Sequence, residues 1–354
     1  MSNLHLSERD LDTPALLLDV AALDRNIARM AAFAHQAGVS LRPHCKTHKC
    51  PHIAAKQFAA GAIGVTCQKL GEAEVMAAAG IGGLLIANQI VGPAKIGRLV
   101  ELARRSGIIV AVDDPYNVAS LSEAASAAGV TLGVLVEVDV GMQRCGVQPG
   151  EPALALARCV LGSPGLRFDG LMGYEGHAVM IADPDERRLK ATAALRQLVD
   201  TADLLRQAGV PVGIVSSSGT GTFDVGGGFP GVTEIQVGSY ATMDGRYQSV
   251  GVPFEPAIAV LATVISTPQP GVTILDAGVK SISTDFGLPT GVSRLSEEHG
   301  WLVEGAEPQL RPGDKVKLLP MHGCTTINLH DRFYVVRDGQ LEDVWPISAR
   351  GRSQ

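Results

Sequence analysis

Residues 42–51 concentrate side chains that could do chemistry. They read Arg-Pro-His-Cys-Lys-Thr-His-Lys-Cys-Pro. The amine of Lys46 could form an imine with a carbonyl group, which is one way in which enzymes activate small molecules. A lone lysine in a loop is more often a solvated surface charge. The role of Lys46 therefore depends on the groups that the fold places around it.

A second candidate lies near the end of the chain, where His322 and Cys324 follow the strand-like run at residues 316–319. If that strand continues, its alternating pleat predicts both side chains on one face, where they could bind one metal ion. Two protein ligands leave positions open for water and substrate, as a catalytic metal requires. Imidazole with thiolate favours Zn²⁺ over Mg²⁺. On spacing alone, a histidine and a buried cysteine this close also occur by chance.

Short apolar segments that alternate with helix-like stretches must position these groups. The predicted helices include residues 21–37, 95–105, 118–128 and 187–207, and the predicted strands are residues 41–46, 64–67, 84–87, 108–113, 132–138, 169–174, 212–217 and 233–237. Eight strands close a parallel (β/α)₈ barrel. A doubly wound open sheet is the main alternative α/β fold.

The pattern changes beyond about residue 245, where short runs of Val, Ile and Thr between Gly and Pro turns replace the helical periodicity. Such runs predict an antiparallel β domain. We expect a TIM-like barrel at residues 20–245 and a β domain made of residues 1–19 and 246–354. The opening strand near residues 16–18 is assigned to the β domain because the barrel reaches eight strands without it.

Polar residues lie where the predicted barrel strands end, and this is the edge at which barrels collect their functional groups. Small-residue loops follow the last two strands, and their backbone N–H groups could surround a phosphate dianion. A lysine at one strand end and phosphate-type loops at two others are the parts that a pyridoxal phosphate enzyme needs. The strand-end residues that we single out are Lys46, Gln68, Arg144, Tyr174 and His177, with Ser218, Gly219, Thr220, Gly221, Gly238, Ser239 and Tyr240 in the two loops.

Composition argues for a small-molecule partner. The formal net charge is −6 without a basic block, which gives no electrostatic footprint for nucleic acid or for a membrane surface. No apolar run reaches membrane-spanning length, and the N-terminus does not resemble a secretory leader. The six cysteines are scattered without CxxC spacing. We therefore expect a reducing, cytoplasmic location.

Several motifs together resemble low-specificity D-threonine aldolase and the related D-serine dehydratases. These motifs are the run at residues 42–51, Val-Glu-Val-Asp-Val-Gly from Val136 with Arg-Cys-Gly-Val from Arg144, Thr-Glu-Ile-Gln-Val-Gly-Ser-Tyr from Thr233, Asp-Ala-Gly from Asp276 and Asn-Leu-His-Asp from Asn328. The resemblance covers nearly the whole chain. It implies the alanine racemase type of fold, a barrel followed by a β domain, and a homodimer.

The resemblance also implies roles for the candidate residues. Lys46 would hold pyridoxal 5'-phosphate as a Schiff base, with Arg144 near the cofactor ring, Tyr174 at its strand end and the two small-residue loops on the phosphate. His322 and Cys324 would bind a divalent metal ion, Zn, Mn or Mg. The order Tyr-Glu-Gly-His at residues 174–177 differs from the Tyr-His-Gly order of some aldolases, so the role of His177 is open.

Three activities are compatible with these parts. The first is reversible cleavage of D-β-hydroxy-α-amino acids such as D-threonine to glycine and an aldehyde, with His177 as a candidate base. The second is dehydration of D-serine or 3-hydroxy-D-aspartate to a 2-oxo acid and ammonia, which the His-x-Cys pair at 322–324 favours. The third, a non-catalytic pyridoxal phosphate carrier, is disfavoured by the second domain and by that pair.

Overall fold

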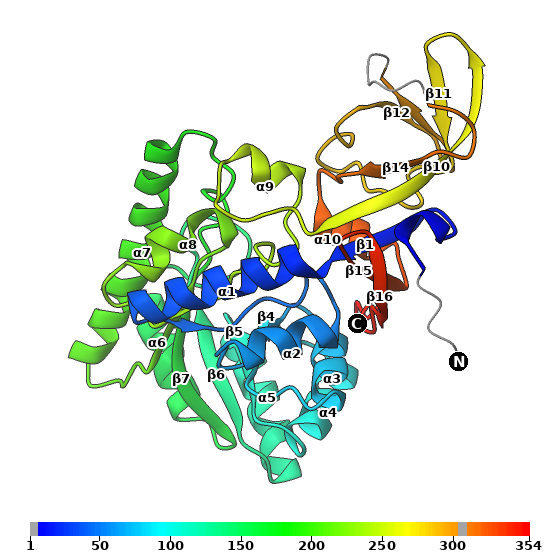
Figure 1. The fold of residues 1–354 in the computed structure, drawn as a ribbon. Coiled ribbons are helices and arrows are strands. Elements are labelled where there is room, and N and C mark those ends of the chain that lie inside the picture. Colours follow the sequence, from blue (N-terminus) through cyan, green and yellow to red (C-terminus); the bar gives the residue numbers. More distant parts are fainter. Residues whose placement is uncertain (1–5, 304–309) are drawn as a thin grey trace. The chain divides into compact units, whose positions relative to one another are not determined.

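The computed structural model describes residues 6–303 and 310–354, which divide into two compact units (Figure 1). The barrel unit comprises Arg29–Lys46, Ile53–Gly238 and Arg352–Gln354. The β unit comprises Met1–Ala28, Thr47–His52 and Ser239–Gly351. Residues 1–5, part of the N-terminal stretch in which the sequence predicts no targeting signal, lie outside the described residues.

The barrel unit contains one eight-stranded parallel sheet. In spatial order its strands are β2 (Ser40–Leu41), β9 (Glu234–Ile235), β8 (Ile214–Ser217), β7 (Leu166–Met172), β6 (Leu132–Glu137), β5 (Ile108–Val112), β4 (Leu84–Gln89) and β3 (Val65–Cys67). A parallel bridge between His44 and Thr66 joins the chain just beyond β2 to β3, so the sheet closes on itself. The predicted (β/α)₈ barrel is confirmed and the open sheet is excluded.

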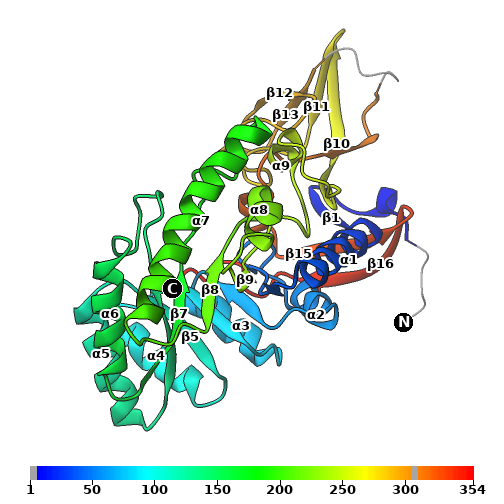
Figure 2. The ribbon, with the colours of Figure 1, turned by 90° about the vertical axis from the view of Figure 1, so that its left-hand side faces the viewer.

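Helices follow or precede these strands as the alternating pattern predicts, and Figure 2 shows α5, α6 and α7 along the outside of the barrel strands. Two helices begin three residues earlier than predicted, because Asp114 and Asp183 cap their first backbone N–H groups and a proline occupies the next position. The helices are α1 (Val20–Ala37), α2 (Pro51–Ala59), α3 (Leu70–Ala78), α4 (Pro93–Ala103), α5 (Pro115–Ala128), α6 (Glu151–Leu161), α7 (Pro184–Gln207) and α8 (Phe223–Gly227).

A buried ion pair and an apolar cluster both stabilise the barrel strands. Arg42 Nη2 lies 2.9 Å from Glu234 Oε2, and both side chains are almost completely buried. Ser216 donates a hydrogen bond of 2.7 Å to the same carboxylate, and the Arg42 guanidinium also donates to the carbonyl of Gly83. The pair therefore joins β9 to β8 and to the segment that leads from β2. The apolar cluster is formed by Leu85, Ala87, Ala111, Leu135 and Met172.

The β unit contains a second sheet whose strands pair antiparallel, except that β1 pairs parallel with β15. The predicted antiparallel β domain is confirmed, and the opening strand pairs with β10 and β15 as expected. In spatial order the strands are β12 (Val292–Leu295), β13 (Gly300–Leu302), β11 (Val272–Leu275), β10 (Ile258–Gln269), β1 (Ala15–Asp19), β15 (Arg332–Arg337) and β16 (Gln340–Pro346), with β14 (Lys315–Leu318) beside β10. Two short helices, α9 (Gly245–Ser249) and α10 (Gly323–Ile327), complete the unit.

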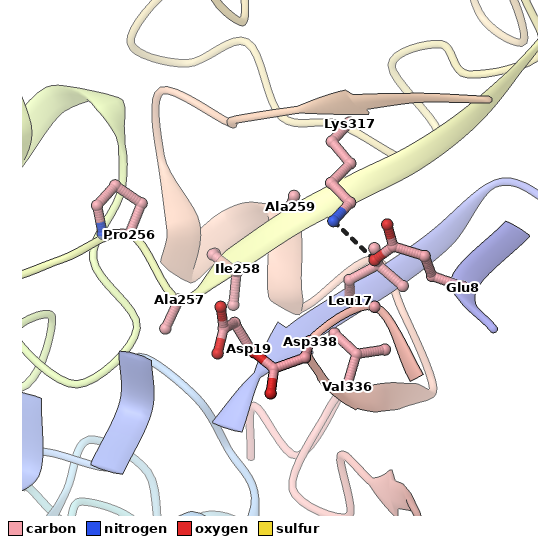
Figure 3. Close-up of a pocket in the computed structure, with 11 residues that line it drawn as sticks. Glu8, Leu17, Asp19, Pro256, Ala257, Ile258, Ala259, Lys317, Val336 and Asp338 are labelled. Carbon is pink, nitrogen blue, oxygen red and sulfur yellow. Dashed lines mark ion pairs between the residues drawn. The ribbon is translucent and has the colours of Figure 1, made fainter. Parts of the chain in front are cut away.

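A pocket of about 350 Å³ lies on the β unit and is lined by residues of β1, β10 and β15 and of the segments next to them (Figure 3). The carboxylates of Asp19 and Asp338 line it, and Lys317 Nζ is 2.7 Å from Glu8 Oε2 at its edge. None of the residues that line it in the described structure is a predicted site residue.

Along residues 6–303 and 310–354, no helix combines the length and apolar character needed to cross a bilayer.

Candidate functional site

Lys46 lies in the loop that follows β2. The strand ends at Leu41 rather than at the predicted residue 46, because Pro43 has no N–H to donate to the ladder. His44 still donates its N–H to Val237 and Cys45 to Thr66, so the loop stays tied to both neighbouring strands. Lys46 is therefore held at the carboxyl end of the barrel, where the sequence predicts it.

Three strand ends of the barrel converge on the ring of Tyr174, which follows β7. The Nζ atom of Lys46 is 5.8 Å from the ring centroid, and the Cζ atom of Arg144, in the loop after β6, is 6.0 Å from it. From the loop after β8, a Cβ added at Gly219 would lie 3.1 Å from the Tyr174 Oη atom. The structure thus brings three of the predicted residues around the aromatic ring of a fourth, Tyr174.

The loop after β8 is anchored by Glu175, whose role sequence reasoning missed. Glu175 is completely buried and accepts hydrogen bonds from Ser217 Oγ at 2.7 Å, Ser218 N at 3.2 Å and Thr222 Oγ1 at 2.6 Å. Its place next to Tyr174 in the motif was the available signal. Only the fold shows that its partners come from a loop more than forty residues later in the chain.

The same loop fits a phosphate group. Ser218 has a left-handed φ of 74°, and its buried Oγ atom has no hydrogen-bond partner among the described residues. A Cβ at Gly226 would lie 1.7 Å from that Oγ atom, and a Cβ at Gly221 would lie 1.8 Å from the carbonyl oxygen of Val179. These close approaches explain why glycine occupies both positions. The observation that points to a ligand is the buried Ser218 hydroxyl, which is free to donate to a phosphate oxygen. The residues present therefore fit pyridoxal phosphate.

The remaining predicted cofactor residues are divided between the barrel unit and the β unit. The side chain of Gln68 donates to the carbonyl of Ala87 at 3.2 Å, at the barrel edge. Thr220 and Gly238 are buried in the barrel unit. Ser239 and Tyr240 belong to the β unit. Tyr240 is fully buried there, with its ring centroid 5.6 Å from that of Phe254. Whether these residues contact the cofactor stays a prediction.

His177, the candidate base, is exposed in the loop after β7. It lies over Gly141, which has a φ of +123° and whose added Cβ would come within 2.8 Å of the imidazole. Glycine at position 141 therefore leaves space for the imidazole, which a larger side chain would fill.

At the end of β6, Glu137 accepts a hydrogen bond of 2.5 Å from Gln89. Burial raises the pKa of Glu137, although this hydrogen bond and the charge of Arg144 oppose the shift.

In the β unit, the strand argument for His322 and Cys324 is wrong. Strand β14 ends at Leu318, so no pleat reaches the pair, and His322 instead immediately precedes α10 while Cys324 lies in its first turn. Asp244 fixes the start of this helix by accepting a hydrogen bond of 2.9 Å from the N–H of Gly323. The helix start nevertheless turns the imidazole and the thiol toward each other, and they are hydrogen bonded.

His322 and Cys324 each change the pKa of the other. Burial lowers the pKa of His322, but its hydrogen bond to Cys324, the charge of that thiolate and the carboxylate of Asp285 outweigh this and raise the pKa to about 9. Burial likewise opposes ionisation of Cys324, yet the hydrogen bond and positive charge of His322 lower the pKa of the thiol. The Sγ atom is also 3.5 Å from Thr47 Oγ1 and 3.9 Å from Ser239 Oγ.

These donors fit a divalent metal ion of the softer kind. An imidazole nitrogen and a sulfur that ionises readily, held side by side, are the ligand types of zinc sites. In the part of the chain that the structure describes, no group of three or more His, Cys, Asp or Glu side chains is arranged to hold a metal ion. His322 and Cys324 by themselves would be two protein ligands, and two ligands leave positions for water and substrate, as a catalytic ion requires.

Comparisons with known proteins agree with this geometry. The family model described as alanine racemase, N-terminal domain, matches residues 18–245, and a serine dehydratase domain model matches residues 257–336. D-threonine aldolase from an Arthrobacter species is 43% identical over 97% of this chain and 94% of its own length. The structure of D-threonine aldolase from Filomicrobium marinum superposes with a TM-score of 0.97 at 42% identity, covering 100% of both chains.

A dehydratase is also similar. The structure of D-threo-3-hydroxyaspartate dehydratase from Delftia sp. HT23 has a TM-score of 0.89 at 30% identity, over 96% of this chain and 98% of that one. Variants of that enzyme replace a histidine and a cysteine two positions apart, and the cysteine variant is in a metal-free form. From the matched barrel model and the end-to-end similarity, the chain belongs to the D-threonine aldolase family of pyridoxal phosphate-dependent lyases, built on the alanine racemase fold.

Proposed function

We propose that the chain cleaves the Cα–Cβ bond of D-configured β-hydroxy-α-amino acids, giving glycine and an aldehyde, with Lys46 as the cofactor lysine and His322 and Cys324 as metal ligands. The observation that carries the proposal is the convergence of Lys46 and Arg144 on the ring of Tyr174, beside the phosphate-type loop. Similarity to D-threonine aldolases and to a 3-hydroxy-D-aspartate aldolase supports the choice of substrate class.

Each residue around Tyr174 has a chemical task in this proposal. Lys46 would hold pyridoxal phosphate covalently, because its amine is the group that can form an imine with the cofactor aldehyde. Ser218 and the glycines at 219 and 221 hold the phosphate, and Glu175 keeps their loop in place. Pyridoxal phosphate, when bound, supplies the ring that delocalises the electron pair left at Cα. The cation of Arg144 stabilises that negative charge.

The proton on the β-hydroxyl must leave before the carbon–carbon bond breaks. His177, which is exposed in the loop after β7, is our candidate for accepting it, because imidazole is a common general base in enzymes. A divalent metal, when bound by His322 and Cys324, supplies the Lewis acid that lowers the pKa of that hydroxyl. Homodimer formation and a cytoplasmic location remain predictions from the sequence and its family.

Dehydration is the second candidate, and one observation favours it. The second metal ligand here is a cysteine, and the dehydratase from Delftia has variants at a histidine and a cysteine with the same spacing. In this version Lys46 removes the Cα proton, and the β-hydroxyl leaves as water. D-Threonine would then give 2-oxobutanoate and ammonia.

Product analysis with D-threonine separates the two. Purified full-length enzyme, supplied with pyridoxal phosphate and Zn²⁺ or Mn²⁺, is expected to form glycine and acetaldehyde in equal amounts. L-Threonine serves as the control substrate and should remain intact. A chelated sample tests the metal, because activity should fall and return when the metal is restored. Formation of 2-oxobutanoate with ammonia would establish the dehydratase instead, and no turnover of any D-β-hydroxy amino acid would refute both.

A further inference from the structure

One ring nitrogen of His322, Nδ1, contacts a carboxylate, which leaves the other nitrogen, Nε2, for the proposed metal. Asp285 Oδ2 lies 2.5 Å from His322 Nδ1. Asp285 comes from the segment between β11 and β12, about forty residues earlier in the chain than α10. No pattern in the sequence pairs these two residues, so the contact is a product of the fold.

The carboxylate is itself held in place by two hydroxyls. Asp285 Oδ1 accepts hydrogen bonds from Ser283 Oγ at 2.5 Å and from Thr325 Oγ1 at 3.1 Å. Thr325 lies in α10 beside Cys324, while the backbone N–H of Ser283 donates to Thr326 Oγ1 at 3.2 Å. The segment that carries Asp285 is thus bonded to the same short helix that carries Cys324.

Ring packing restricts the imidazole as well. Phe286, the next residue after Asp285, has its ring centroid 4.6 Å from that of His322, tilted by 50°. The guanidinium of Arg246 lies on the Phe286 ring, 3.4 Å from its centroid. One dipeptide therefore both bonds the imidazole through Asp285 and packs against it through Phe286, which leaves His322 little freedom to rotate.

A carboxylate accepts hydrogen bonds and does not donate them when ionised. An imidazole that binds a metal is neutral, with one N–H and one lone pair. If its Nδ1 faces Asp285, Nδ1 carries the hydrogen and Nε2 offers the lone pair to the metal. Metal-binding histidines are commonly fixed in this way by a carboxylate on the other ring nitrogen, which also makes the ligand more basic.

We propose that Asp285 is a positioning residue, which fixes the ring and tautomer of His322 so that Nε2 is presented for metal binding, and which thereby sets the metal affinity of the site. This inference rests on the proposed metal role of His322 and Cys324. It assigns to Asp285 no contact with the substrate. A purely structural alternative is that the contact only joins the β11–β12 segment to α10.

Metal affinity tests the inference without reference to activity. Full-length wild type, Asp285→Asn, Asp285→Ala and His322→Ala are titrated with Zn²⁺ in competition with a chromophoric chelator, and each is also melted without metal. Asparagine keeps an oxygen that can accept from Nδ1, whereas alanine removes the acceptor. We expect Zn²⁺ affinity to fall by about 10-fold in Asp285→Asn and by up to about 100-fold in Asp285→Ala, the range for losing such a partner. Glu298→Gln is the matched control, because Glu298 is an exposed carboxylate of the same unit that pairs with Lys280.

The outcomes distinguish the inference from the proposal beneath it. Graded loss of affinity in the Asp285 variants, with metal-free melting temperatures equal to that of the control, supports the positioning role. Unchanged Zn²⁺ affinity in both Asp285 variants, while His322→Ala has lost it, would overturn the inference and leave the metal site intact. Equal losses in Asp285→Asn and His322→Ala would overturn it in favour of Asp285 as a direct ligand. If wild type and His322→Ala bind Zn²⁺ equally weakly, the metal site fails and the inference fails with it.

Discussion

The barrel unit and the β unit hold their candidate groups in different ways. In the barrel, Lys46, Arg144 and Tyr174 follow three separate parallel strands, and the closure of the sheet alone brings their loops to one edge. In the β unit, His322 and Cys324 lie at the start of a five-residue helix, α10, and depend on partners from other segments, such as Asp244 and Asp285.

The difference shows where each site is robust. A barrel rim tolerates variation within one loop because the other strand ends are positioned independently. A pair at the start of a short helix has no such redundancy, since an isolated helix of this length is not stable by itself. The barrel site should therefore be sensitive to loss of a reacting group, and the β-unit pair should be sensitive to loss of its supporting contacts.

The largest expected effect is at Lys46, the proposed cofactor lysine of the barrel. Lys46→Ala removes the amine that we propose attaches the cofactor, so the imine absorbance of the purified enzyme should disappear. Activity should be lost almost completely, because the amine that forms the covalent link to the cofactor is gone. Absorption spectra and steady-state rates measure both. Lys95→Ala, at an exposed lysine of α4, is the control. An unchanged spectrum in Lys46→Ala would refute the central assignment.

The second prediction concerns what holds the barrel strands together. Glu234→Gln leaves the buried Arg42 without its counter-ion, and breaking a buried pair in this way costs about 3–5 kcal/mol in the free energy of unfolding. Urea unfolding of the holoenzyme measures it. In the β unit, the pair of Arg25 and Glu255 is largely exposed and screened by solvent, so Glu255→Gln should cost far less than Glu234→Gln. Equal losses in the two variants would contradict the comparison.

The sequence predicts the strands of this molecule better than it predicts where the helices begin. The eight barrel strands and the opening β strand are read from short apolar runs, because buried parallel strands have few other compositions. Helix starts are missed by three residues at Asp114 and Asp183, since capping residues are polar and precede the apolar pattern.

The candidate sites divide along the same line. Strand-end position predicts that Lys46, Arg144, Tyr174 and Gly219 meet, because all carboxyl ends of parallel strands lie at one edge. The partners Glu175 and Asp285 are not predicted, since each contacts a segment that is distant in the sequence and no spacing rule relates them. The sequence correctly predicts that His322 and Cys324 lie together, but it attributes this to a strand. Strand β14 ends before it reaches them, and the start of α10 brings them together instead.

The smallest predicted effect lies in the β unit, at His330, and it concerns the slope of stability with pH. Burial lowers the pKa of His330, and its Nε2 atom is hydrogen bonded to the carbonyl of Ser281 at 2.8 Å. The unfolded chain has the ordinary histidine pKa of about 6.5. Below that pH the unfolded chain binds a proton that the folded chain does not, so stability falls as pH falls.

Above pH 6.5 the histidine is neutral in both states, and its contribution no longer changes with pH. Glutamine at 330 keeps an amide N–H for the Ser281 carbonyl but cannot be protonated. The difference in unfolding free energy between pH 7.5 and pH 5.5 should therefore be smaller in His330→Gln than in wild type, as measured by urea unfolding at each pH. A steeper slope in His330→Gln would show instead that the folded β unit favours the protonated form of His330, and that burial does not control its charge.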